Sequence, residues 1–163
     1  MIKADNPRRA ARTLTTAAIL LSVQLLFSGC GLVSEALRVD PAVLDDVRGI
    51  GKVLAEATTE TPGQAGGPDK MTNTFVIDVG GVNAQDSLKK ARGILLAHKW
   101  VSAAEEPPGG VRVKSPAWEG AYLNVRSYGS VTLGNYPEEI KKAVEAAADP
   151  EVLLIVDTEQ VPA

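Results

Sequence analysis

The sequence predicts a small α+β domain over residues 74–163, in which two helices pack on an antiparallel sheet. Short stretches that alternate apolar and polar residues, as half-buried strands do, are interleaved with stretches of helical apolar spacing. The chain of 163 residues is 45% apolar and 23% charged, which is typical of a globular protein and leaves room for one domain and a targeting segment.

The chain begins with the pattern of a secretory signal peptide. Residues 1–12 carry four basic residues and one acid, and residues 13–27 form an apolar run without any charge. A membrane-spanning helix needs roughly 20 apolar residues, so an uncleaved signal anchor is the weaker alternative. The pair Arg8-Arg9 leaves both general secretion and twin-arginine export open.

The residues Leu26-Phe27-Ser28-Gly29-Cys30 resemble the lipobox of bacterial lipoproteins. The resemblance implies that residues 1–29 are removed and that the Cys30 thiol receives a diacylglyceryl group. It also implies that the protein sits on the extracytoplasmic face of the cell membrane. Two or three acyl chains are enough for stable anchoring. Because Cys30 is the only cysteine, an intramolecular disulfide and a thiolate metal cluster are excluded.

The segment after the anchor, residues 30–57, predicts an amphipathic stalk helix. Asp40 is a suitable N-cap, Pro41 a suitable first helical residue, and apolar residues recur every three or four positions from 43 to 57. Gly49 and Gly51 weaken the helix at its middle. Residues 58–73, with two prolines and three glycines, have the composition of a linker.

The remaining chain alternates between strand and helix patterns. The predicted elements are strands at 74–79, 100–104 with a second arm at 111–114, 121–128 and 151–157, and helices at 84–98 and 137–148. This order is that of the ferredoxin-like β-α-β-β-α-β arrangement. Right-handed crossovers would place both helices on one face of a four-stranded antiparallel sheet, with its first and third strands inside. We expect the helix at 41–57 to cover the other face.

Motifs of catalysis are missing from the sequence. It contains no Walker, GxGxxG or HExxH pattern, and its one histidine, His98, falls at a predicted helix end, where it would act as a cap. We therefore predict no enzymatic activity, no cofactor and no metal site. The formal charge is −3, and loss of residues 1–29 makes it more negative, which argues against a nucleic-acid partner.

One strand face combines arginine with tyrosine, which are enriched where proteins meet partners. The candidate partner-binding residues are Arg112, Lys114, Trp118, Tyr122, Asn124, Arg126 and Tyr128. The competing interpretation is a sheet face that is merely solvated or covered by a helix.

These observations predict a lipid-anchored binding or accessory protein of the cell envelope, with an envelope or membrane protein as a possible partner. Two alternatives stay open. One is a small-ligand carrier with a cavity between the stalk helix and the sheet. The other is a hydrolase that uses carboxylates at strand ends, Asp78 and Asp157, as acid and base.

Overall fold

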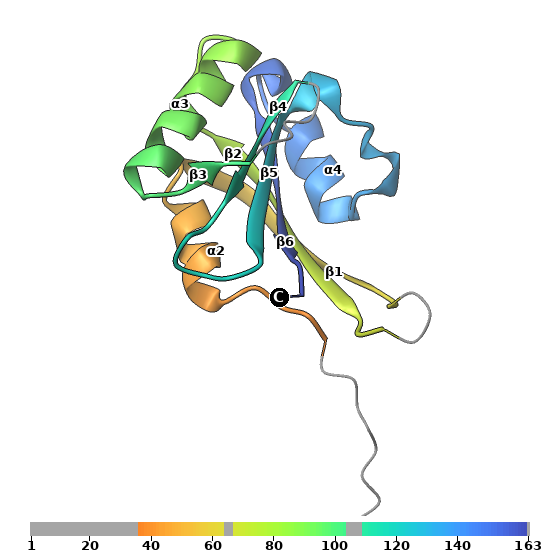
Figure 1. Cartoon of the computed structure of the whole chain (residues 1–163). Coiled ribbons are helices and arrows are strands. Elements are labelled where there is room, and N and C mark those ends of the chain that lie inside the picture. Colours follow the sequence, from red (N-terminus) through yellow and green to blue (C-terminus); the bar gives the residue numbers. More distant parts are fainter. Residues whose placement is uncertain (1–35, 64–66, 104–108, 163) are drawn as a thin grey trace, which may run out of the picture. The chain divides into compact units, whose positions relative to one another are not determined.

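A six-stranded antiparallel sheet with helices on both faces forms the folded part of the chain (Figure 1). The computed structural model describes residues 36–63, 67–103 and 109–162. Its helices are α2 (Pro41–Arg48), α3 (Ala84–Ala97) and α4 (Glu138–Glu145), and its strands are β1 (Lys52–Thr61), β2 (Lys70–Asp78), β3 (Val101–Ser102), β4 (Gly110–Lys114), β5 (Ala121–Ser127) and β6 (Leu154–Gln160). The predicted α+β class is confirmed. Cys30 and the predicted signal peptide lie outside the described residues.

The predicted four-stranded ferredoxin-like sheet is wrong. The strand order is β1-β2-β6-β5-β4-β3, so β6 lies between the two strands that were expected to be neighbours. The chain leaves β5, forms α4 and returns antiparallel beside β5 instead of crossing over it. The apolar run Leu154-Ile155-Val156 suits this position, because a central strand is buried on both faces.

The helices also lie on opposite faces of the sheet, not on one face as predicted. Side chains of α2 and α3 pack on one face, and those of α4 pack on the other. Figure 1 shows α2 and α3 on one side of the strands and α4 across from them.

The predicted helix over 41–57 ends at Arg48, and the chain continues as β1. Gly49 caps the helix. Gly51 then passes so close to β2 that an added Cβ would lie 2.5 Å from the backbone oxygen of Asp78. Val53 and Leu54 are strand residues that join different apolar clusters, because successive side chains of a strand point to opposite faces of the sheet. Their helical spacing was therefore coincidental.

The predicted linker over 58–73 is mostly the far end of a long hairpin. β1 and β2 stay paired as far as Thr61 and Lys70. The threonines of this segment favour strand, since β-branched side chains fit a pleated, half-buried surface. Its prolines and glycines lie between the two strands, from Pro62 to Pro68, where a hairpin needs its turn.

The other predicted helices are confirmed with small shifts at their ends. The Asn83 side chain accepts a hydrogen bond from the backbone N–H of Asp86 at 2.9 Å and caps α3. Pro137 sits immediately before α4. Of the strand expected at 100–104, the structure shows the two residues of β3, with Trp100 just before it turned into the core at 2% exposure, and Ala104 lies outside the described residues.

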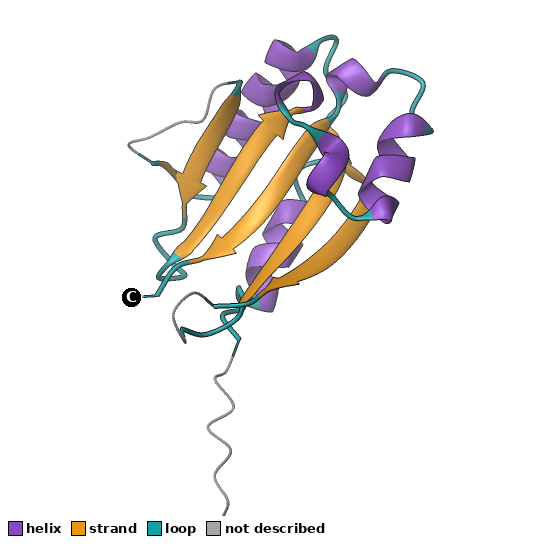
Figure 2. Ribbon diagram, turned by 90° about the vertical axis from the view of Figure 1, so that its right-hand side faces the viewer, coloured by secondary structure: helices purple, strands orange, loops and turns teal. Residues whose placement is uncertain are grey.

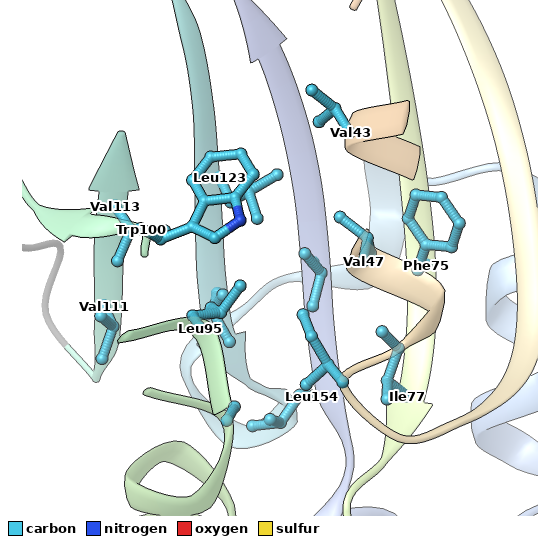
Figure 3. Packing of buried hydrophobic residues seen from close by; sticks show 14 of the residues in the cluster. Val43, Val47, Phe75, Ile77, Leu95, Trp100, Val111, Val113, Leu123 and Leu154 are labelled. Carbon is cyan, nitrogen blue, oxygen red and sulfur yellow. The ribbon is translucent and has the colours of Figure 1, made fainter. Parts of the chain in front are cut away.

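Two apolar clusters hold the layers together. In the larger one, Val43 and Val47 of α2 and Leu95 of α3 lie against Phe75, Leu123 and neighbouring sheet residues (Figure 3). In the smaller one, Ile140 and Val144 of α4 lie against Val76 and Ile155. Figure 2 looks onto the α4 side and shows helices in front of only one end of the strands. The other end of this face is left open.

No helix among the described residues is long and apolar enough to span a membrane.

Candidate functional site

The uncovered end of the sheet on the α4 side is polar across five strands. We call it the polar face. It consists of Thr59 and Thr61 of β1, Lys70, Thr72 and Thr74 of β2, Asp157 and Glu159 of β6, Tyr122, Asn124 and Arg126 of β5, and Arg112 and Lys114 of β4. The residues between them on β4 and β5, such as Val113 and Leu123, are buried on the opposite face. Strand alternation thus separates an apolar face from a polar one.

The sheet splits within the polar face. β2 and β6 pair only from Thr74 to Ile77, whereas β1 stays with β2 to Lys70 and β6 stays with β5 to Gln160. Just past the last pair, the backbone N–H of Asn73 donates to Thr158 Oγ1 at 3.1 Å. At this point the Thr158 hydroxyl replaces the backbone carbonyl that would accept this hydrogen bond in a continuous sheet.

A hollow of about 320 Å³ lies over this split. We call it the polar cleft. Its walls are Thr59, Thr61, Lys70, Thr72 and Thr74 on one side and Asn124, Asp157, Thr158 and Glu159 on the other, and Asn135, Tyr136 and Pro137 also line it. The volume is at the lower end of the range of small-molecule sites, about 300–1,000 Å³.

Asp157 is the centre of the first hydrogen-bond network in the cleft. It accepts hydrogen bonds from Arg126 Nη2, from the Tyr136 hydroxyl at 3.1 Å and from Thr74 Oγ1 at 2.7 Å. Arg126 Nη2 also donates to the Tyr136 hydroxyl. Burial, and then the negative charge of Asp157, raise the pKa of Tyr136 to about 12. Tyr136 therefore stays protonated as a donor at neutral pH.

Glu159 is the centre of the second network. It accepts from Lys70 Nζ at 2.8 Å and from Arg112 Nη2 at 3.0 Å. Burial favours the neutral acid, but the hydrogen bond from Lys70 and the charges of Lys70 and Arg112 hold the pKa of Glu159 below its ordinary value. The guanidinium carbon of Arg112 lies 4.8 Å from the centre of the Tyr122 ring, which holds both side chains in place.

Several polar groups of the cleft have no such partner. The side chains of Thr59, Thr61, Thr72 and Asn135 make no hydrogen bond to another residue in the described part of the chain. They are hydroxyls and an amide, which both donate and accept.

Five of the seven predicted partner-binding residues lie together on the polar face: Arg112, Lys114, Tyr122, Asn124 and Arg126. Tyr128 instead follows β5 in a short 3₁₀ turn and packs with the smaller apolar cluster under α4. Trp118 packs with the larger cluster on the other side of the sheet, 6.1 Å from Trp100 between ring centres.

Sequence reasoning missed Lys70, Glu159, Tyr136 and the threonines of the cleft. Alternation of threonine at 59 and 61 and at 72 and 74 is a strand signal that could have placed two of the walls. Tyr136 carried no such signal, because its contact with Asp157 depends on how the chain returns after β5.

The carboxylates of the hydrolase alternative do not come together. Asp157 lies opposite Thr74, and Asp78 is four residues further along the same strand, about 13 Å away. The Asp78 carboxylate accepts from the backbone N–H of Gly80 at 2.7 Å. No group of three or more potential ligands that could hold a metal occurs among the described residues.

The ligand-carrier alternative needs an open space between residues 41–57 and the sheet. Val43, Val47 and Ile50, which would border that space, are 2% exposed or less and pack in one cluster with Phe75 and Ile77. The helix and the sheet are therefore in close contact where the carrier would need its cavity.

Comparison of the chain with protein-family models, with curated proteins and with solved structures finds no match. The fold and the site define an α+β protein with a polar cleft in a split antiparallel sheet.

Proposed function

We propose that this protein is a lipid-anchored binding or accessory protein of the bacterial cell envelope, and that it binds through the polar face. The lipobox-like residues ending in Cys30 support the anchor. The observation that carries the binding role is the network of Arg126, Asp157 and Tyr136, which lies toward the end of the sheet face that α4 leaves open.

This network favours binding because its side chains are already fixed in position before a partner binds. The side chains of Arg126 and Asp157 are 30% and 14% exposed and hold each other in place, so little rotamer freedom is left to lose when a partner binds. The side chains of Arg112 and Tyr122 are stacked and extend the fixed surface to the edge of the face. Arginine and tyrosine in such positions are typical of binding hot spots.

Catalysis has less support in the same geometry. Lys70 and Arg112 hold the pKa of Glu159 below its ordinary value, and the Asp157 carboxylate is bonded to Arg126, Tyr136 and Thr74, so both carboxylates are already engaged by neighbouring side chains. The proposal is therefore a binding role without chemistry.

Photo-crosslinking in intact cells tests this proposal. A photoreactive residue replaces Lys114, which is exposed on the polar face, or Lys89, which is exposed on α3 across the sheet. We expect a cross-linked adduct from position 114 and none from position 89. The adduct should disappear in the double variant Arg126→Gln/Asp157→Asn, which removes the two charges together. Equal adducts at both positions, or an adduct that survives in the double variant, would contradict the proposal.

A further inference from the structure

We infer that the polar cleft binds a neutral, polyhydroxylated unit, namely the uncharged sugar headgroup of a membrane glycolipid. This inference rests on the proposed function and names the ligand of the same face.

The charges of the cleft argue for a neutral ligand. Lys70 and Arg112 are both bonded to Glu159, and Arg126 is bonded to Asp157. An ionic ligand would have to compete with these pairs, and each displaced partner would be left in a partly buried place without a counter-charge. A neutral ligand leaves these ion pairs intact and can form hydrogen bonds to their fixed charged groups.

The uncommitted groups of the cleft match sugar hydroxyls. Thr59, Thr61 and Thr72 line one wall, and Asn135 lies on another side of the hollow. A hydroxyl or amide can donate to one ligand oxygen and accept from the next, as the hydroxyls of a sugar do in return. Tyr136 and Pro137 add apolar surface against which the C–H groups of a sugar ring can pack.

The place where the anchor segment joins the sheet favours a ligand at the membrane. Leu37 is hydrogen-bonded to the start of β2, beside the cleft: its N–H donates to the Asp69 carbonyl at 2.7 Å, and its carbonyl accepts from the Met71 N–H at 2.9 Å. Leu37 comes seven positions after Cys30, a stretch of chain that spans at most about 25 Å. With Cys30 acylated, the wall formed by Lys70 and Thr72 stays within reach of lipid headgroups.

The test uses the full lipidated protein in phosphatidylcholine vesicles, and its readout is hydrogen exchange of β1, β2 and β6. One set of vesicles also contains monogalactosyl diacylglycerol, a second contains anionic phosphatidylglycerol, and a third receives free galactose in solution. We expect slower exchange at residues 59–61, 70–74 and 157–159 with the galactolipid alone.

The double variant Thr59→Val/Thr72→Val keeps β-branched side chains but removes two hydroxyls, and should weaken the galactolipid effect about tenfold. Thr58→Val is the control on the same strand, because Thr58 is exposed and faces the other side of the sheet, where its hydroxyl accepts a hydrogen bond from Asn73 Nδ2 at 2.8 Å, so this variant removes a hydroxyl outside the cleft. We expect it to leave the effect unchanged.

Slower exchange with phosphatidylglycerol would show that charge drives binding and would overturn the inference. The same effect from free galactose would overturn the membrane source of the ligand. Absence of any galactolipid effect while position 114 still cross-links in cells would overturn this inference and leave the proposed function standing.

Discussion

Arg126 of β5 and Asp157 of β6 form an ion pair diagonally across two central strands, with the Tyr136 hydroxyl bonded to both. Asp157 lies directly opposite Asn124, and Arg126 lies opposite Ile155. The long arginine side chain therefore reaches along the polar face to the carboxylate. This link joins the middle of the sheet to the segment before α4, which carries Tyr136.

Breaking this ion pair is expected to destabilise the fold. Asp157→Ala removes the counter-charge of Arg126 and the acceptor of Thr74, so the free energy of unfolding should fall by about 2–3 kcal/mol, between the values for exposed and buried pairs. Urea denaturation measures the change. The control is Glu138→Ala, which breaks the exposed pair with Lys141 and should change stability far less than Asp157→Ala does. Equal effects of the two variants would contradict the role of the pair.

Tyr136 should give stability a distinct dependence on alkaline pH. Its pKa is about 12 in the folded chain, against an ordinary value of 10.0. Between these two values the unfolded chain loses the phenolic proton first, so stability falls as pH rises through this window. Tyr136→Phe should remove that slope, which urea midpoints at several alkaline pH values would show. An unchanged slope would mean that Tyr136 titrates normally.

Glu159 should contribute to acid sensitivity with the opposite sign. Because its pKa is lowered in the folded chain, its contribution is present above the ordinary value of 4.5 and is lost as pH falls through the lower, folded value. Glu159→Gln should make the acid loss of stability shallower, as measured by circular dichroism during acid titration. A variant with the same acid profile as the unchanged chain would refute this assignment.

The helices and the polar strands could be predicted where the signals are local. Asn83 and Pro137 mark the starts of α3 and α4, and alternation along 121–127 separates Leu123 from Tyr122 and Asn124. These features depend on neighbouring residues only. The α+β class followed from them.

The strand order and half of the cleft could not be predicted, because they depend on contacts between distant segments. Nothing local in 151–160 says that β6 pairs with β2 on one side and β5 on the other. Because Val53 and Leu54 were assigned to a helix, β1 was not predicted. The hairpin that carries Thr59, Lys70 and Thr72 was therefore missed as well. Gly51 was a residue that argued against a continuous helix here. A glycine stands at this position because the chain passes close to β2.

Two glycines should respond in opposite ways to alanine. Gly51→Ala would bring a Cβ to 2.5 Å from the Asp78 backbone oxygen, so it should destabilise the fold by about 1–3 kcal/mol. Gly93→Ala adds a Cβ in α3 with nothing within 4 Å and should stabilise the fold by about 0.5–1 kcal/mol. Thermal unfolding compares the two directly. A tolerated Gly51→Ala would argue against the observed junction between α2 and β1.

The two faces of β5 should separate stability from binding. Leu123 is fully buried, and Leu123→Ala should lower the unfolding free energy by about 2–5 kcal/mol. Tyr122→Ala on the polar face should weaken cross-linking from position 114 while changing stability less than Leu123→Ala does. Cross-linking that is undiminished by Tyr122→Ala would remove this tyrosine from the binding surface.

The measurement that tests the central claim most directly is the intact mass of the protein in the membrane fraction of its native host. If the protein is anchored as proposed, we expect a chain that starts at Cys30 and carries the mass of a diacylglyceryl group. The Cys30→Ala variant should keep the domain folded but release it from the membrane or leave its precursor unprocessed. An unmodified chain that retains Met1–Gly29 would contradict the anchor and, with it, the placement of the polar cleft at the membrane.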